Sequence, residues 1–169
     1  MISTVRYSLR ELTAADHRVL WLMLMHAAHE SSIMAVESNP DLARYASGWR
    51  RAGDIGTVAE VGDLPIGAAW LRLWSKDDRG YGYIADDIPE LAIALLPDYR
   101  GQGIGTALLT SVLHEASKRY PAVSLSIRAD NPALRLYQRF SFRPVAGTEV
   151  INRTGGRSFS MVYACSKGL

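Results

Sequence analysis

Apolar and polar residues alternate at the start of the chain and then recur at a helical spacing. The alternation over Val5–Leu9 predicts a half-buried strand. From Thr13, a cap residue, to about Ala28, apolar residues share one broad face, which predicts an amphipathic helix. A second, short helix is expected to begin at the pair Asn39-Pro40 and to end near Gly53.

The next pattern is that of a hairpin followed by an irregular segment. Two strands, Thr57–Val61 and Ile66–Trp74, are joined by turn residues at 62–65. The segment Ser75–Asp87 is rich in turn residues and charges, which is typical of a long loop. Leu91–Leu95 is strongly apolar and predicts another strand.

The second half of the chain continues to alternate between helices and strands. A helix is expected over Gly103–Lys118, a strand over Val123–Ile127 and a helix over Asn131–Phe140. The remainder, to about Cys165, predicts a final hairpin that turns at 154–156. This order predicts a single α/β domain over residues 1–169, with a central mixed sheet flanked by helices.

Composition restricts the classes of protein that fit this pattern. Hydrophobic residues make up 48% and charged residues 21%, which is typical of a soluble globular protein. The net charge of +2 is spread without a basic block, which argues against nucleic-acid binding. No apolar run has the length of a membrane span or a signal peptide, and the single Cys165 allows no internal disulfide. We therefore expect a cytoplasmic protein without membrane or nucleic-acid partners.

Glycines cluster between the apolar strand at 91–95 and the helix that follows it. The cluster consists of Arg100, Gly101, Gln102, Gly103, Ile104 and Gly105. Glycines let a ligand approach bare N–H groups, and a helix start offers unpaired donors and a partial positive charge. This combination predicts a phosphate or pyrophosphate site, against the alternative of a turn that binds nothing. The loop lacks both the lysine of a Walker A motif and the glycine spacing of a dinucleotide fingerprint.

The R-G-Q-G-I-G sequence of this loop resembles the acetyl-CoA loop of the GNAT superfamily of N-acetyltransferases. A second segment, ADNPALRLYQRFSFRP at 129–144, resembles the family's N-x-x-A-x-x-L-Y-x-x-x-G-F element. Four residues match it, namely Asn131, Leu136, Tyr137 and Phe142. Ser141 stands where the family has glycine, and the alanine is shifted to Ala133. The resemblance implies a GNAT-like fold, with a mostly antiparallel sheet splayed at the acetyl-CoA site, and acetyl-CoA as the acetyl donor.

Carried over residue by residue, the resemblance implies a cofactor site made of several segments. The pyrophosphate would be held, mainly by backbone N–H groups, at Arg100, Gly101, Gln102, Gly103, Ile104, Gly105 and Thr106. The pantetheine arm would bond to main-chain groups of Ile93, Ala94 and Leu95. Asn131 would hydrogen-bond the pantetheine, unless it only caps the helix that follows. Arg135 could reach a phosphate, although an exposed helical arginine is the simpler interpretation.

Two residues are candidates for proton transfer. Tyr137 matches the family's general acid, and a tyrosine with an ordinary pKa near ~10 is protonated at neutral pH and able to donate to a departing thiolate. The alternative for Tyr137 is a core aromatic. Glu90 is the candidate base, because in an extended strand Glu90, Ala92 and Ala94 share one face and leave room beside the carboxylate. The alternative for Glu90 is an ordinary charge at a strand end.

The acceptor is expected to be a primary amine, of a small molecule or a peptide, that attacks the acetyl group directly. Acidic residues in the loops 30–39 and 75–87, which are expected to frame it, slightly favour a cationic acceptor. The four histidines lack the spacing of metal ligands, so no metal site is expected. The alternative function is that of a non-catalytic sensor that binds acyl-CoA. A homodimer is common in such families, and the sequence does not test it.

Overall fold

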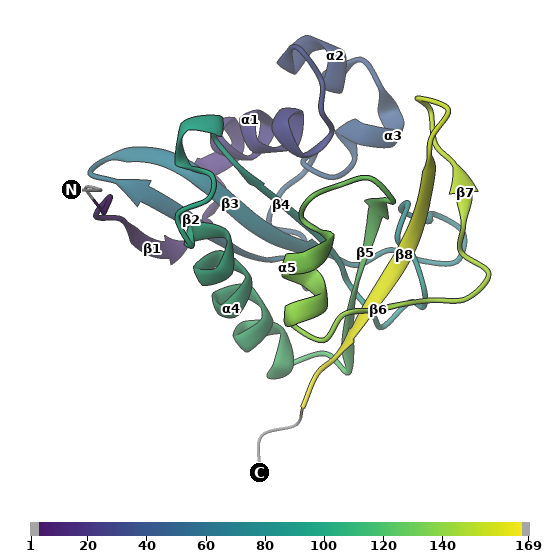
Figure 1. Cartoon of the computed structure of the whole chain (residues 1–169). Coiled ribbons are helices and arrows are strands. Elements are labelled where there is room, and N and C mark those ends of the chain that lie inside the picture. Colours follow the sequence, from purple (N-terminus) through teal and green to yellow (C-terminus); the bar gives the residue numbers. More distant parts are fainter. Residues whose placement is uncertain (1–3, 167–169) are drawn as a thin grey trace. The chain divides into compact units, whose positions relative to one another are not determined.

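The structure, a computed structural model, describes residues 4–166 (Figure 1). These residues divide into two compact units. The first unit comprises residues 4–72 and 92–114, and the second comprises 73–91 and 115–166.

The first unit holds most of the helices. Its elements in chain order are β1 (Ser8–Glu11), η1 (Ala14–Asp16), α1 (His17–Ala27), α2 (Ile33–Glu37), α3 (Pro40–Ala43), β2 (Ile55–Val61), β3 (Leu64–Arg72), the end of β4 (Glu90–Leu95), η2 (Pro97–Tyr99) and most of α4 (Ile104–Ser117). The expected cap is present, because Thr13 and Asp16 form a capping box at the start of η1.

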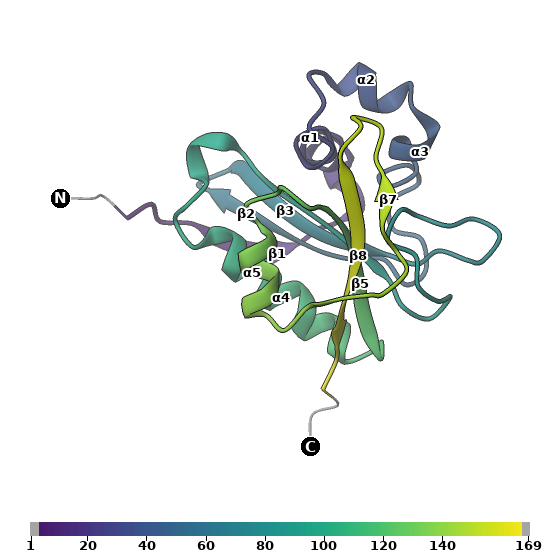
Figure 2. The ribbon, with the colours of Figure 1, turned by 45° about the vertical axis from the view of Figure 1, so that its right-hand side comes forward.

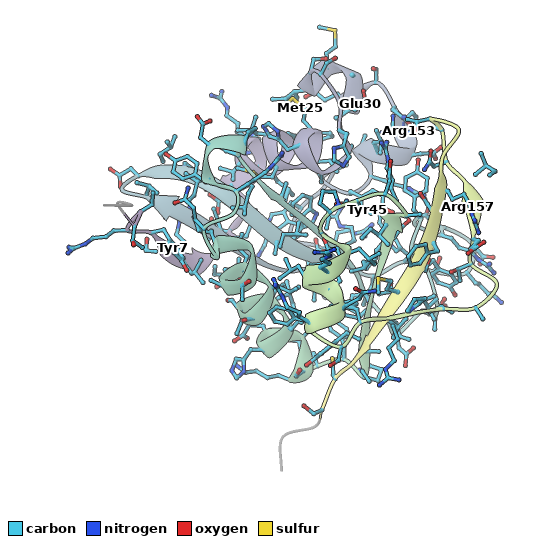
Figure 3. The ribbon with its side chains drawn as sticks, viewed as in Figure 1. Tyr7, Met25, Glu30, Tyr45, Arg153 and Arg157 are labelled. Atoms are coloured by element: carbon cyan, nitrogen blue, oxygen red, sulfur yellow. The ribbon has the colours of Figure 1, made fainter. Side chains whose placement is uncertain are left out.

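Strands β1, β2 and β3 form an antiparallel layer with helices on both faces. On one face, Thr57 Oγ1 lies 3.0 Å from Ser111 Oγ of α4. On the other face, the indole N–H of Trp70 donates to the carbonyl oxygen of Tyr45, which is labelled in Figure 3, at 3.0 Å. Gly67 of β3 allows close packing on the α4 side, since a Cβ there would lie only 2.4 Å from Leu95.

A buried ion pair fixes the chain between α3 and β2. The guanidinium of Arg72 donates to the carboxylate of Asp54 at 2.8 and 3.2 Å, and both side chains are 1% exposed. Arg72 also donates to the carbonyl oxygens of Arg44 and Ser47, at 2.8 and 2.5 Å. If α3 continued, these carbonyl oxygens would accept hydrogen bonds from backbone N–H groups of the helix. The guanidinium of Arg72 takes the place of those donors.

The second unit is mostly strand. It contains the start of β4, the end of α4, β5 (Ala122–Arg128), α5 (Leu134–Arg139), β6 (Arg143–Pro144), β7 (Val150–Ile151) and β8 (Arg157–Ala164). Strand β5 pairs in parallel with β4 at Glu90 and Ser124, and antiparallel with β8 along its whole length. Strand β7 pairs with β8 in a hairpin (Figure 2), on which Arg153 and Arg157 lie (Figure 3).

In the order of hydrogen-bonded neighbours, the strands of the sheet are β1-β2-β3-β4-β5-β8-β6, with β7 paired to β8. The sheet is mixed, with helices alongside, which confirms the expected α/β class. None of the helices within residues 4–166 is both long and apolar enough to cross a membrane. That residues 1–169 form one N-acetyltransferase domain stays a prediction.

Several boundaries differ from the expected ones. The loop expected at 30–39 contains α2, which begins because the Ser32 hydroxyl accepts from the Ala35 N–H. Helix α3 was expected to run to about Gly53, but it ends at Ala43. Helix α5 begins at Leu134 instead of Asn131, because residues 131–133 form a turn.

Candidate functional site

The predicted phosphate loop is shaped by left-handed backbone at two glycines. The φ angles of Gly101 and Gly103 are +73° and +83°, a region that favours glycine. A Cβ placed on either would meet no atom within 4 Å, so conformation and not crowding requires glycine here. The backbone of this loop therefore borders open space directly before the N-terminus of α4, where N–H groups can bind an anion.

Side chains of the loop tie it to its own supports. Arg100 Nε donates to the carbonyl oxygen of Leu95 at 3.2 Å, and Gln102 Nε2 donates to that of Asp98 at 3.1 Å. Ile104, the first residue of α4, is buried and so fixes the end of the loop in the core. The structure thus brings together the loop and the end of β4, both of which the sequence assigns to the cofactor.

The sequence interpretation missed His26, at the end of α1 in the same unit. It was set aside with the other histidines because their spacing is not that of metal ligands, but it is half-buried. Burial, and after it the positive charge of Arg100, lower the pKa of His26 below its ordinary value. Because this effect needs the tertiary structure, the sequence gives no signal that a histidine lies near Arg100.

Tyr137 is the one buried residue of α5, at 8% exposed. Its ring packs edge-on against Phe142, with centroids 5.7 Å apart, and Phe142 in turn packs against Tyr163 at 5.5 Å. Burial raises the pKa of Tyr137 well above its ordinary value, so the phenol keeps its proton at neutral pH. These contacts agree with a core aromatic and also with a protonated donor.

The start of α5 shows how the second family segment folds. Asn131 Oδ1 accepts a hydrogen bond from the Ala133 N–H at 2.8 Å, which closes the turn before α5, while the N-cap position of α5 is Ala133 and not Asn131. The side-chain amide nitrogen of Asn131 is the group that would donate to a ligand. Arg135 is exposed on α5. Ser141, which replaces the family's glycine, adopts the left-handed φ of +69° that glycine takes most readily.

Glu90 is buried at the start of β4, at 3% exposed. Its Oε2 accepts from the indole N–H of Trp74 at 3.0 Å, and its Oε1 accepts from the N–H of Gly82 in a short hydrogen bond. Glu90 is therefore not an ordinary surface charge at a strand end. Both carboxylate oxygens are used to hold neighbouring segments of the chain.

Within the second unit, Glu90 and Tyr137 belong to opposite faces of the sheet. Glu90 pairs with Ser124 of β5, so the two side chains share one face. Tyr137 packs through Phe142 onto Tyr163, whose partner on β5 is Val123, the neighbour of Ser124. Successive residues of a strand point to opposite faces, so the candidate acid and the candidate base approach β5 from different sides.

In the part of the chain that the structure describes, no three histidine, cysteine or carboxylate side chains are grouped so that they could hold a metal ion. The candidate functional features of the described residues are the glycine-rich loop, the buried phenol of Tyr137 and the buried carboxylate of Glu90.

The profile of the acetyltransferase (GNAT) family matches residues 7–142 of the chain. The match covers most of the sequence, and the chain belongs to this acetyltransferase family, as the two motifs indicated. The family assignment from the sequence is thereby confirmed.

Individual relatives agree with this assignment. Mycothiol acetyltransferase of Corynebacterium aurimucosum is 35% identical over 78 residues, which are 45% of this chain and 24% of that protein. The chain thus spans about a quarter of the length of this curated relative. The crystal structure of the ribosomal-protein-S18-alanine N-acetyltransferase from Escherichia coli matches with a TM-score of 0.68 and 20% identity, over 97% of both chains. The acetyltransferase yncA from Salmonella typhimurium, in complex with acetyl-CoA, matches with a TM-score of 0.71 and 19% identity, over 96% of this chain and 95% of that one.

Proposed function

We propose that this protein is an acetyl-CoA-dependent N-acetyltransferase that moves the acetyl group to a primary amine by direct attack. The observation that carries the proposal is the loop with left-handed Gly101 and Gly103 before α4, in a chain of the GNAT family. Its open backbone fits a pyrophosphate, which needs several N–H donors close together.

The cofactor would be held by the residues that the resemblance indicated. The loop 100–106 would bind the pyrophosphate, and the backbone of Ile93, Ala94 and Leu95 would bind the pantetheine arm. The bond from Arg100 to Leu95 supports this assignment, since it joins the two segments. Asn131 and Arg135 are further candidates. The Salmonella relative, which carries acetyl-CoA, supports acetyl-CoA as the donor.

Tyr137 is the proposed proton donor. Its raised pKa means that the phenol is fully protonated at neutral pH, as a donor must be. The same shift makes complete proton transfer to a thiolate of pKa near ~8.5 uphill. Its contribution is therefore mainly a hydrogen bond to the sulfur as charge develops there.

Glu90 is the proposed proton acceptor for the amine. An alkylammonium group has a pKa near ~10.4, so a neutral amine is scarce at neutral pH and a base assists the attack. Each carboxylate oxygen carries two lone pairs, and one of them would accept the proton of the amine. The two bonds from Trp74 and Gly82 fix the carboxylate in one orientation.

The acceptor is proposed to be cationic and to approach the segment 75–87. This segment carries four carboxylates, which are Asp77, Asp78, Asp86 and Asp87. A small diamine, a lysine side chain and a peptide N-terminus all present the required ammonium group. The Escherichia coli relative is named for acetylation of an alanine of a ribosomal protein, which supports including peptides.

The test is an acceptor panel in which release of the free CoA thiol is followed. The panel contains spermidine, a peptide with an N-terminal alanine, the same peptide with a blocked N-terminus and an internal lysine, and a blocked peptide without amines. Amine-dependent thiol release is the expected result. Tight acetyl-CoA binding without turnover on any amine would favour the non-catalytic sensor instead. A cytoplasmic location and a homodimer stay predictions.

A further inference from the structure

The segment Gly80–Gly82 lies against a buried carboxylate. Glu90 accepts hydrogen bonds from the Gly82 N–H and from the indole N–H of Trp74, at separate oxygens. All of these residues belong to the second unit. The segment Gly80–Gly82, which is neither helix nor strand, is thus held by the buried carboxylate of Glu90 instead of by hydrogen bonds between paired strands.

Gly80 and Gly82 must both be glycine because neighbouring atoms lie too close to leave room for a side chain. Neither has a φ in the left-handed region, so a turn does not demand them. A Cβ on Gly80 would lie 2.2 Å from Trp74 Nε1 and 2.7 Å from Glu90 Oε2. A Cβ on Gly82 would lie 2.6 Å from Glu90 Oε1 and within 2.9 Å of the backbone of Leu125 and Ser126. No side chain fits at either position without displacing the segment.

Between the two glycines, Tyr81 is directed outward and is 51% exposed. The segment packs onto the backbone of β5 at Ser126, the exposed position of that otherwise buried strand. Ser126 shares its face with Ser124 and therefore with Glu90. Tyr81 thus stands beside an uncovered polar part of the sheet, on the same face as the candidate base.

The surroundings of Tyr81 suit a cation. Two residues further on, the Tyr83 hydroxyl donates to Asp86 Oδ1 at 2.5 Å, so an acidic side chain is held in the same segment. An ammonium group is attracted both by an aromatic ring face and by carboxylates. The backbone at Gly80 and Gly82 is held by Glu90 and by close packing on β5, so the ring of Tyr81 would be presented at a modest cost in chain freedom.

We propose that Glu90 is a positioning residue that holds Gly80–Gly82 on β5, so that Tyr81 contacts the cationic amine acceptor. This inference rests on the proposed function, which supplies the amine. The positioning role requires no proton transfer by Glu90, so an experiment can distinguish it from the proposed role of Glu90 as a base. Tyr81 is then a specificity-determining residue for the acceptor.

The experiment uses variants that disturb the segment and leave the carboxylate in place. Trp74→Phe removes one donor to Glu90, Gly82→Ala forces the segment off β5, and Tyr81→Ala removes the ring. Hydrogen exchange of the peptide covering 80–83 is measured without acceptor, and acceptor KM and kcat are measured with the best amine of the panel. Tyr7→Ala, at another exposed tyrosine, is the control.

Trp74→Phe and Gly82→Ala should speed exchange in 80–83 and raise the acceptor KM by about tenfold, with kcat changed less than KM. Tyr81→Ala should raise KM without faster exchange, and Tyr7→Ala should change neither. For Glu90→Gln, the loss of positioning should raise the acceptor KM by a factor that does not vary with pH. The separate loss of the base should lower kcat most near neutral pH, and this part should shrink as pH rises.

Two results would overturn the inference alone, with the proposed function intact. One is unchanged exchange in both Trp74→Phe and Gly82→Ala, which would show that Glu90 does not hold the segment. The other is an unchanged KM in Tyr81→Ala for an amine that the wild type acetylates. If the wild type acetylates no amine, the proposed function fails and the acceptor role of Tyr81 fails with it, while the exchange data still decide whether Glu90 holds the segment.

Discussion

Arg100 Nε donates a hydrogen bond to the carbonyl oxygen of Leu95 at 3.2 Å, joining the glycine loop to the end of β4. An arginine can make this bond and still present its terminal nitrogens to an anion, because the guanidinium carries five N–H donors. Arg100 therefore both shapes the loop and adds positive charge in front of α4.

The requirement for glycine at 103 can be tested with a matched pair of variants. Gly103 and Gly155 have nearly identical φ angles, +83° and +84°, and open space around the absent Cβ. Gly103→Ala and Gly155→Ala should each destabilise the fold by about 1–2 kcal/mol, the cost of a left-handed non-glycine residue. Only Gly103→Ala should also weaken acetyl-CoA binding in calorimetry. Equal, unimpaired binding in both would mean that the loop is a turn and nothing else.

The pKa of His26 should change when the pyrophosphate of acetyl-CoA binds. Its pKa is lowered by burial and by Arg100, so without ligand it should titrate below the ordinary value of about 6.5. Phosphate charge beside Arg100 favours protonated His26, so binding should raise this pKa and take up a proton. Acetyl-CoA affinity should therefore increase as pH falls below about 6.5.

The measurement is the NMR titration of the His26 ring with and without acetyl-CoA. S-acetyl-pantetheine, which lacks the pyrophosphate, should leave the His26 titration unchanged. A His26 pKa that acetyl-CoA does not move would contradict the placement of the pyrophosphate beside Arg100.

Tyr137→Phe tests the proton donor. The ring and its packing on Phe142 remain, and the hydroxyl is lost. A positioned acid is typically worth ~10²–10⁴-fold in rate, so kcat should fall by that order while acetyl-CoA binds as before. Tyr163→Phe, in the same aromatic cluster, should keep its activity. Near-normal turnover of Tyr137→Phe would assign protonation of the thiolate to solvent.

Breaking the buried pair of Arg72 and Asp54 should be costly. Asp54→Ala leaves Arg72 without its carboxylate in a dry environment and should cost about 3–5 kcal/mol in urea unfolding. Glu115→Ala, which breaks an exposed pair with Lys118, should cost at most about 1 kcal/mol. Comparable losses would show that Arg72 reaches other partners or water.

Sequence patterns within a few residues correctly predicted those helices, strands and caps that depend on contacts between residues close together in the chain. Helix α4 was predicted because its apolar residues recur at a helical spacing, and those at 108, 109, 112, 113 and 116 are buried. The hairpin of β2 and β3 and the cap at Thr13 were also predicted, because turn residues and cap residues are signals that lie within a few positions of the chain.

Relations between distant residues could not be predicted. Helix α3 ends early because its following carbonyl oxygens bind Arg72, which lies 28 residues from Arg44. Glu90 was expected beside open space, yet Trp74 and Gly82 occupy its two oxygens. Nothing in the spacing of Gly80 and Gly82 distinguishes a close approach from a flexible turn. His26 likewise acquires its shifted pKa only through the fold.

The most direct test of the account is to find where the acetyl group goes. The protein is incubated with acetyl-CoA carrying ¹³C in the acetyl group and with the best acceptor of the panel, and the product is examined by NMR and mass spectrometry. The account predicts one labelled acetyl group in amide linkage to a primary amine nitrogen, formed in step with free CoA. Labelled acetate without acetylated acceptor, or label on oxygen or sulfur, would contradict it.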